Sequence, residues 1–180
     1  VSKIGTGVFE PEFQALEKIL EKYEYGNYFN NLKVNTFNFN KDFSALKNHT
    51  KEHCSGDYIF HIDADEIPNE VLLKQLPQIL EINDTDLVWV PRINIVNGIT
   101  EFHMNLWKWR QTEQGWINFP DYQARIFRNV DHIKWVKPVH EVIDGATTYS
   151  HLPPHEELTL KHEKEIARQE VQNKLYDQII

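Results

Sequence analysis

The sequence predicts an α/β fold in which helices flank a mixed sheet, with an irregular antiparallel C-terminal half. Between residues 9 and 91, a segment with apolar residues at helical spacing is followed by a short apolar run, and this pair of patterns occurs three times. From residue 92 onward, Trp, His and Pro are frequent, and short alternating runs favour antiparallel strands joined by long loops. Residues 1–180 show no repeat or linker, so we expect a single domain.

The first expected elements are a helix over residues 9–23 and a short strand or extended segment over residues 32–39. Apolar residues spaced three and four apart predict the helix, and Pro11 suits its first turn. Gly26 and the neighbouring Asn residues end this helix. A second helix is expected over residues 42–54.

A buried strand is expected over residues 58–62, because its side chains are nearly all apolar. Pro68 suits the first turn of a third helix, and a strand over residues 87–91 follows that helix. The buried face of the third helix would consist of the apolar side chains Val71, Leu72, Leu76, Ile79 and Leu80.

The C-terminal half contains two short runs and one longer amphipathic pattern. Residues 124–128 and 133–136 alternate as antiparallel strands do, and residues 158–180 have the pattern of a charged helix. These assignments complete a mixed sheet in which the second half contributes the antiparallel strands.

Composition excludes several functional classes. The chain has 27 acidic and 19 basic residues, a net charge of −8, and no block of Lys or Arg, so a long nucleic acid is a poor partner. The apolar runs are four or five residues long, so no transmembrane segment is expected. The one cysteine, Cys54, cannot form an internal disulfide and suits a reducing compartment. We therefore expect a cytoplasmic location, either free or peripheral to a membrane.

Three carboxylates, Asp63, Asp65 and Glu66, directly follow the strand expected over residues 58–62. This is the carboxyl end of a sheet strand, where open α/β sheets bind ligands. Two Asp residues at i and i+2 can direct oxygens toward one point, and Mg²⁺ or Mn²⁺ takes such ligands while keeping positions for phosphate oxygens. The pattern indicates either a metal-bound nucleotide diphosphate or simple capping of the helix near Pro68.

Two other metal-dependent chemistries fit the neighbouring residues less well. A phosphatase that forms an aspartyl phosphate needs Thr or Val after the second Asp, where Glu66 stands. A nucleotidyltransferase needs a Gly-Ser helix start upstream, which the sequence lacks. Both classes stay open as weaker alternatives.

Several segments, in the right order, resemble one known family. Residues 55–66, SGDYIFHIDADE, resemble the strand and DxD turn of family 2 glycosyltransferases, which have the GT-A fold, and residues 42–48, DFSALKN, resemble that family's helix start. Residues 120–129, PDYQARIFRN, and 139–141, VHE, resemble paired motifs of the branch that includes lipopolysaccharide core glucosyltransferases. His162 and the segment after it resemble the family's closing histidine and helix.

The resemblance covers about residues 36–176 and implies a GT-A-like fold. The family's first strand, which binds the nucleotide base, has no counterpart here, and residues 2–7 match the second strand only loosely. We expect residues 1–180 to form a single glycosyltransferase-like domain that lacks this first nucleotide-binding strand.

The resemblance also implies a metal site. In the resembling enzymes, the DxD carboxylates hold a divalent cation that bridges the two donor phosphates. Asp65 is the first expected ligand and His162 the second, and Asp63 either joins them or reaches the donor ribose. The implied cofactor is Mn²⁺ or Mg²⁺. An exposed imidazole without a ligand is the alternative for His162.

An inverting transferase needs a general base for the acceptor hydroxyl, and Glu141 and Asp121 are the candidates, with a preference for Glu141. The alternative role for either is a salt bridge to Arg125 or Arg128. Lys47, Arg125 and Arg128 are expected to bind the donor diphosphate through their positive charges. Since strand residues alternate, Arg125 and Arg128 face opposite sides and cannot easily reach one site.

Acceptor binding is expected to involve aromatic side chains. Trp116 and Trp135 belong to the Trp-rich half of the chain, and sugar rings stack on aromatic faces. Packing in the core is the alternative role for each, because Trp buries a large apolar surface.

The predicted function is metal-dependent, inverting transfer of a sugar from a nucleotide-diphosphate sugar, first of all a UDP-sugar, to a hydroxyl acceptor. The acceptor would be a glycan, in lipid-linked or protein-linked form. The alternative is a non-catalytic carbohydrate-binding or scaffold module with a degenerate GT-A fold, which the missing first strand favours.

Overall fold

The computed structural model describes residues 2–4 and 35–176. Its strands are β1 (Ser2–Ile4), β2 (Asn35–Phe37), β3 (Tyr58–Phe60), β4 (Glu66–Pro68), β5 (Leu87–Asn97), β6 (Ile117–Arg128), β7 (Lys134–Val136), β8 (Val142–Asp144), β9 (Tyr149–His151) and β10 (Leu160–Glu165). Its helices are α2 (Phe43–Glu52), α3 (Glu70–Ile82), α4 (Glu101–Trp107) and α5 (Ile166–Tyr176), with a 3₁₀ turn at Glu156–Leu158.

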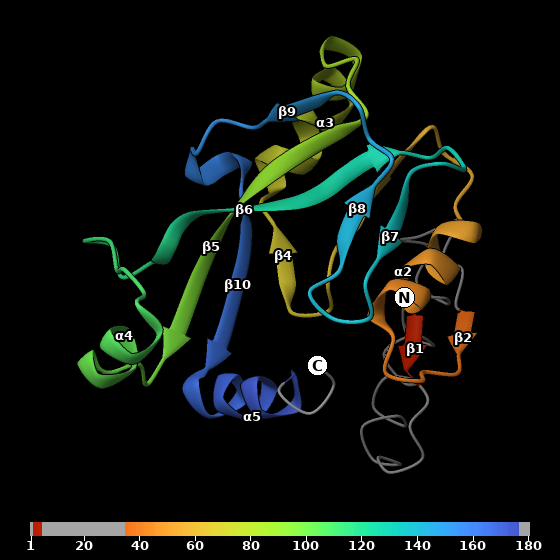
Figure 1. Ribbon diagram of the computed structural model, residues 1–180. Helices are drawn as coiled ribbons and strands as arrows, with labels where there is room; N and C mark the ends of the chain where they lie inside the picture. The colour runs from red at the N-terminus through yellow and green to blue at the C-terminus, as the bar shows by residue number, and fades with distance from the viewer. Residues whose placement is uncertain (1, 5–34, 177–180) are drawn as a thin grey trace, which may run out of the picture.

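A mixed sheet forms the centre of the described structure (Figure 1). Its strand order is β3-β6-β5-β10-β4, and β9 pairs with β5 outside this order. Strand β6 is antiparallel to β3 and β5, whereas β10 is parallel to β5 and antiparallel to β4. Strands β7 and β8 form a separate antiparallel pair. The predicted mixed sheet with flanking helices is confirmed, and the arrangement is GT-A-like. The C-terminal half is only partly antiparallel, because β9 and β10 pair in parallel with β5.

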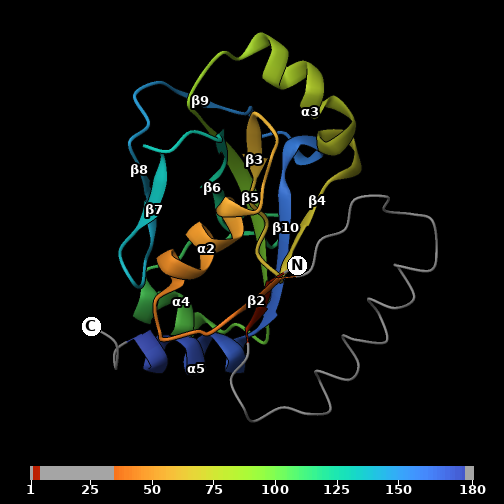
Figure 2. The same ribbon diagram turned by 90° about the vertical axis from the view of Figure 1, so that its right-hand side faces the viewer.

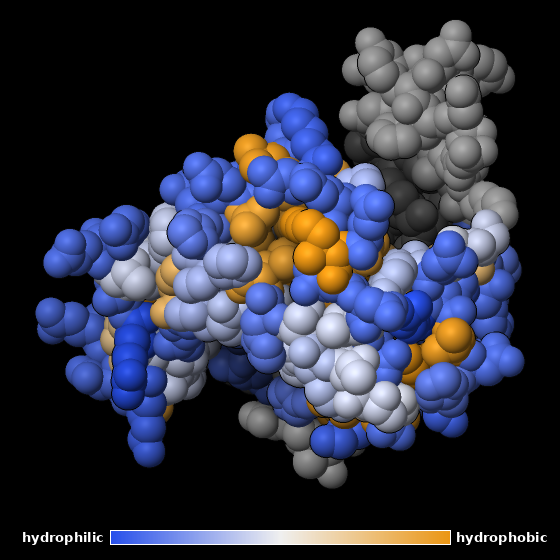
Figure 3. Space-filling view, turned by 90° about the horizontal axis from the view of Figure 1, so that it is seen from above, coloured by the Kyte–Doolittle hydropathy of each residue, from blue (hydrophilic) through white to orange (hydrophobic). Residues whose placement is uncertain are grey.

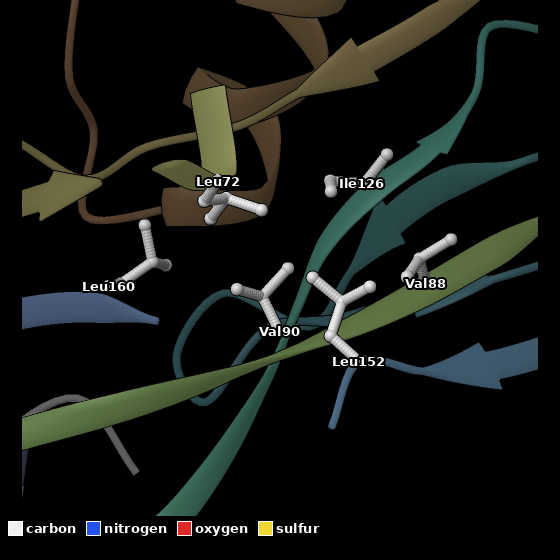
Figure 4. Close-up of a cluster of buried hydrophobic side chains, with 6 residues drawn as sticks. All are labelled: Leu72, Val88, Val90, Ile126, Leu152 and Leu160. Carbon is white, nitrogen blue, oxygen red and sulfur yellow. The ribbon is translucent and has the colours of Figure 1, made fainter. Parts of the chain in front are cut away.

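Different elements cover the two faces of this sheet (Figure 2). Leu72 of α3 packs on one face, and Trp135 of β7 packs on the other. Neighbouring strand residues point to opposite faces, so each strand supplies both cores. The first cluster consists of Leu72, Val88, Val90, Ile126, Leu152 and Leu160 (Figure 4). The second consists of Ile59, Leu87, Phe127, Ile133 and Trp135.

Local capping explains where two of the helices begin. Asp42 precedes α2, and its Oδ1 accepts a hydrogen bond from the backbone N of Ala45 at 2.9 Å. Asn69 precedes α3, and its Oδ1 accepts from the backbone N of Val71 at 2.9 Å. Such caps satisfy N–H groups that the first helical turn leaves unpaired. Both helices thus form where the apolar patterns predict them, over slightly shorter ranges.

The expected helix start at Pro68 is wrong. Pro68 ends β4, which pairs with β10 through the partners Pro68–Leu160 and Glu66–His162. Because β4 lies at the edge of the sheet, a residue without an N–H group is tolerated there. The helix begins only at Glu70, after its Asn69 cap.

The expected helix over residues 158–180 is also wrong in its first part. Residues Leu160–Glu165 form β10, which lies between β5 and β4, and only Ile166–Tyr176 are helical. In this strand Leu160 and His162 are buried and Lys161 is exposed, which is the alternation of a strand. Pairing on both edges outweighs the weak helical pattern of a charged segment.

The other predicted strands differ from the observed ones only in length, whereas β8 and β9 were not predicted. The strand expected over residues 58–62 ends at Phe60, and the strand expected over residues 87–91 continues to Asn97. Strand β2 lies within the extended segment expected over residues 32–39 and is parallel to β1. The helix expected over residues 9–23 lies outside the described residues.

Core packing around Leu72 provides a test of the fold. This side chain is completely buried at the centre of the first cluster, whereas Leu73 beside it is 46% exposed. We expect Leu72→Ala to lower the free energy of unfolding by about 2–5 kcal/mol, because the substitution leaves a cavity. The control Leu73→Ala should cost well under half as much. Equal losses in urea denaturation would contradict this packing.

The surface above α3 is mostly hydrophilic, with a smaller hydrophobic area (Figure 3). Leu73 and Ile82 are the large apolar side chains of α3 with the greatest exposure. Among the helices of the described ranges, none has the length and apolar character needed to cross a bilayer.

Candidate active site

A cleft of about 810 Å³ opens beside the DxD turn that follows β3. Elements far apart in the sequence form its walls: α2, β5, β6, β10, α5 and the segment around β7 and β8. Seven of the ten predicted site residues line it, namely Lys47, Asp63, Asp65, Arg125, Trp135, Glu141 and His162. The segment that resembles a transferase motif therefore lies at a cleft, as expected for a ligand site.

Asp63 lies at the meeting point of three cationic or polar groups. Its carboxylate forms ion pairs with Arg125 and, at 3.3 Å, with Lys47, and His61 Nε2 lies 3.0 Å from Oδ1. Burial alone would raise the pKa of Asp63, but the His61 hydrogen bond and the Arg125 and Lys47 charges lower it well below its ordinary range. Asp63 is therefore ionised.

Lys47 joins the DxD turn to the segment that carries Glu141. Its side chain is 8% exposed, and its Nζ lies 2.6 Å from Glu141 Oε1 as well as 3.3 Å from Asp63 Oδ1. The ring of Trp135 lies beneath this ammonium group, 4.4 Å from Nζ to the ring centroid. Trp135 is 4% exposed, so most of its surface packs in the core and beneath Lys47 rather than facing the cleft.

Asp65 and His162 form a second pair in the cleft. His162 Nε2 lies 3.5 Å from Asp65 Oδ2, and Arg168 Nη2 lies 3.3 Å from the same oxygen. The other ring nitrogen, Nδ1, is 2.9 Å from Asn94 Oδ1, which fixes the orientation of the imidazole. The hydrogen bond with His162 lowers the pKa of Asp65, against a smaller opposing effect of burial.

The potential metal ligands form a small set. Within residues 2–4 and 35–176, no three His, Cys, Asp or Glu side chains come together as a metal-binding group. Asp65 and His162 provide a carboxylate oxygen and an imidazole nitrogen, both suited to Mn²⁺. Mg²⁺ and related ions commonly use one or two protein carboxylates, with waters and substrate phosphates as the remaining ligands.

Asp121 is held tightly behind the cleft. Its Oδ2 accepts from Arg92 Nη2 at 2.7 Å and from Asn94 Nδ2 at 2.8 Å, while its Oδ1 accepts from Gln123 Nε2 at 2.9 Å. The salt bridge considered from the sequence exists, although its partner is Arg92 rather than Arg125 or Arg128. As far as the described residues define the cleft, Asp121 is not part of its lining.

Arg128 and Trp116 are placed away from the other predicted residues. Arg128 forms ion pairs with Asp84 and Asp86, and its guanidinium lies over the Tyr58 ring. Since Arg125 reaches Asp63, the two arginines serve different places, as the strand alternation indicates. Trp116 packs against Phe119 at a centroid distance of 4.9 Å and, among the described side chains, does not line the cleft.

Sequence reasoning assigned no site role to Glu66, Arg92, Asn94 or Lys164. Arg92, Asn94 and Lys164 line or adjoin the cleft because β5 continues past residue 91 and β10 is a strand rather than a helix. In the observed registers Arg92 lies opposite Asp121, and Asn94 lies opposite His162. Burial lowers the pKa of Lys164 in this position. In the sequence, these residues could have been found only by extending the strand over residues 87–91 and by assigning a strand to residues 160–165.

The comparison with protein families agrees with this geometry. A profile described as "Glycosyl transferase family 2" matches residues 14–139, which is more than half of the chain. The chain belongs to this family. It is therefore a glycosyltransferase, and a nucleotide-sugar donor and a glycan acceptor are its general substrates. A search of curated proteins found no significant match.

The histidine beside Asp63 gives this glycosyltransferase a pH-dependent stability. Burial lowers the pKa of His61 below 6.5, opposed by the hydrogen bond with Asp63 and assisted by Lys47 and Arg125. Below pH 6.5 the unfolded chain binds a proton that folded His61 does not, so stability present above pH 6.5 is lost as the pH falls.

We expect His61→Gln to flatten the decline of the free energy of unfolding below pH 6.5, measured by urea denaturation at several pH values. Substituting the exposed His132 by Gln is the control and should keep the wild-type slope. The same slope in both variants would show that His61 does not remain neutral in the folded protein.

Proposed function

We propose that this chain catalyses inverting transfer of a sugar from a nucleotide-diphosphate sugar to a hydroxyl group, with Mn²⁺ or Mg²⁺ as cofactor. One observation carries the proposal: in a family 2 chain, the DxD carboxylates, two cations and a separate carboxylate meet in one cleft. These are the types of group that a charged donor and a nucleophilic acceptor require.

The residues of the cleft fit a divalent cation. Asp65 and His162 would hold the ion, and Asp63 would join them or contact its water shell. When bound, such an ion neutralises negative charge on the donor diphosphate as the bond to the sugar breaks. Arg168, 3.3 Å from Asp65 Oδ2, would balance the charge of Asp65 while the cofactor is absent.

Lys47 and Arg125 would bind the donor diphosphate. Both side chains are largely buried yet line the cleft, so their charges are poorly screened by water. Arg125 presents a planar guanidinium that matches phosphate geometry, and Lys47 presents a compact charge. The ion pairs with Asp63 hold both groups beside the DxD turn, where the diphosphate would arrive.

Glu141 would act as the general base. Its side chain is 16% exposed and lines the cleft, so an acceptor hydroxyl can approach its carboxylate. Asp121 is the second candidate, but both of its oxygens already accept hydrogen bonds from neighbouring side chains. A base must reach the proton that it removes, which favours Glu141. The proton of the acceptor hydroxyl would pass to Glu141 as the oxygen attacks the sugar carbon.

The donor and acceptor are narrower proposals. The motifs at residues 120–129 and 139–141 support membership of the branch that resembles lipopolysaccharide core glucosyltransferases, so UDP-glucose is the first donor to test. A glycan, lipid-linked or protein-linked, would approach from the side of Glu141 and the β7–β8 pair. Trp135 would support this wall through its contact with Lys47.

The test is release of nucleotide from UDP-glucose, UDP-galactose, UDP-N-acetylglucosamine and GDP-mannose, with Mn²⁺, with Mg²⁺ and with EDTA. We expect slow hydrolysis of at least one donor that stops with EDTA. Calorimetry should show that UDP or GDP binds more tightly with Mn²⁺ than with EDTA. If no nucleotide binds and no donor is cleaved, the proposal fails and a non-catalytic carbohydrate-binding module becomes the better account.

A further inference from the structure

We propose that Glu66 is a positioning residue of the cleft, whose carboxylate sets the orientation of Arg92, Arg125 and the DxD turn. The inference rests on the proposed function, since it assigns a role within the same transfer site. Glu66 itself is not a catalytic residue, because its side chain has no exposed surface and lies behind the groups that face the cleft.

The Glu66 carboxylate is shared between two arginines. Its Oε1 accepts from Arg125 Nη2 at 2.6 Å and from Arg92 Nη1 at 2.8 Å. Both arginines line the cleft and keep little exposed surface. Charge-assisted hydrogen bonds of this kind are short and directional, so one buried oxygen restricts both guanidinium planes.

The same carboxylate also closes the DxD turn. Glu66 Oε2 accepts from the backbone N of Asp63 at 3.2 Å, and the backbone N of Glu66 donates to the carbonyl oxygen of Asp63 at 3.0 Å. Strand β4 then holds Glu66 opposite His162 of β10. The turn that carries Asp63 and Asp65 is therefore tied to the centre of the sheet through one side chain.

Each arginine also contacts a second carboxylate. Arg125 forms its ion pair with Asp63, and Arg92 contacts Asp121 through Nε at 3.1 Å and Nη2 at 2.7 Å. Glu66 is thus the common anchor of a chain of contacts that runs from Asp63 to Asp121. Arg92 contacts its two carboxylates through different nitrogens, which restricts its guanidinium plane, and Arg125 places Nη2 between Glu66 and Asp63.

The place of the ion pairs between Glu66, Arg92 and Arg125 indicates that they position charged groups rather than simply stabilise the fold. Buried ion pairs are a poor source of net stability, because removing charges from water offsets most of the attraction. Here both cations border the cleft, and the second partner of each is a predicted site carboxylate. The network therefore acts on the geometry of the charged groups that would meet the donor.

The test compares Glu66→Gln and Glu66→Asp with the control Asp84→Asn. Gln keeps the shape but removes the charge, and Asp keeps the charge but is too short to reach both arginines. Asp84→Asn removes a carboxylate from Arg128, which lies on the same strand as Arg125 but outside the cleft. Circular dichroism at 10 °C establishes which variants fold.

The Nε–H signals of the arginine side chains, measured by nuclear magnetic resonance, report changes in the surroundings of each guanidinium group. We expect both Glu66 variants to shift the Arg92 and Arg125 signals, assigned with Arg92→Lys and Arg125→Lys, and Asp84→Asn to leave them unchanged. In donor hydrolysis with Mn²⁺, a folded Glu66 variant should lose about 10- to 100-fold in kcat, with a smaller change in donor KM. Asp84→Asn should keep the wild-type kcat and KM.

Three results would overturn the inference: unshifted Arg92 and Arg125 signals, kcat within twofold of wild type in a folded variant, or failure of both Glu66 variants to fold. The last would show a residue required for folding rather than for positioning. If the wild-type protein neither binds a nucleotide nor cleaves a donor, the proposed function fails instead, and the arginine signals alone decide whether Glu66 positions these groups.

Discussion

Replacing Glu141 by Gln should lower kcat for sugar transfer by about 10²- to 10⁴-fold, because a positioned general base contributes a factor of that size. Gln has nearly the same shape and can still contact Lys47, so the cleft should keep its form. Donor KM should change little, since Glu141 would act on the acceptor. The measurement is steady-state transfer with the donor and acceptor found to be active.

The matched control is Asp121→Asn, which removes the charge from the other candidate base. Its carboxylate is occupied by Arg92, Asn94 and Gln123, so we expect a smaller loss of kcat, accompanied by lower thermal stability. If Asp121→Asn abolishes transfer while Glu141→Gln retains it, the two roles are reversed. Equal and small losses would show that neither carboxylate takes the acceptor proton.

Replacing Asp65 by Asn should lower metal-dependent donor cleavage by at least about 100-fold. Changes to groups that merely support a metal ligand cost 10- to 100-fold, so loss of a ligand itself should cost no less. Asn removes the charge that His162 and Arg168 now contact but keeps the size of the side chain. Calorimetric titration with Mn²⁺ in the presence of UDP measures the loss of binding directly.

The acidic control for Asp65 is Asp86→Asn. Asp86 accepts hydrogen bonds from the Thr147 backbone and hydroxyl groups, both at 2.8 Å, and does not line the described cleft. This variant should lose stability but bind Mn²⁺ and UDP as the wild type does. Unchanged Mn²⁺ binding in Asp65→Asn would remove Asp65 from the metal site and leave ion pairing with His162 and Arg168 as its role, since Asn69 caps α3.

Elements that depend on nearby residues were predictable from the sequence. The Asp42 cap begins α2 close to the expected position, and the buried strand β3 leads directly into the DxD turn. Strand alternation also separated Arg125 from Arg128 correctly. Each of these features is decided by side chains within about one helical turn or one strand, which a local pattern can capture.

The remaining features depend on which strands become neighbours. Residues 160–165 have a charged, helix-like sequence, and they form a strand because β5 and β4 offer pairing partners on both sides. The same pairing turns Pro68 into a strand residue. No pattern within either segment carries this information.

By itself, the sequence determined the family motifs, the alternation of helices and strands, and the concentration of acidic groups after β3. Only the tertiary structure decided that Arg92 lies opposite Asp121, that Asn94 lies opposite His162, and that Glu66 contacts both Arg92 and Arg125. The physical reason is that cross-strand neighbours are set by sheet order and register. These depend on hydrogen bonds and packing between segments far apart in the chain.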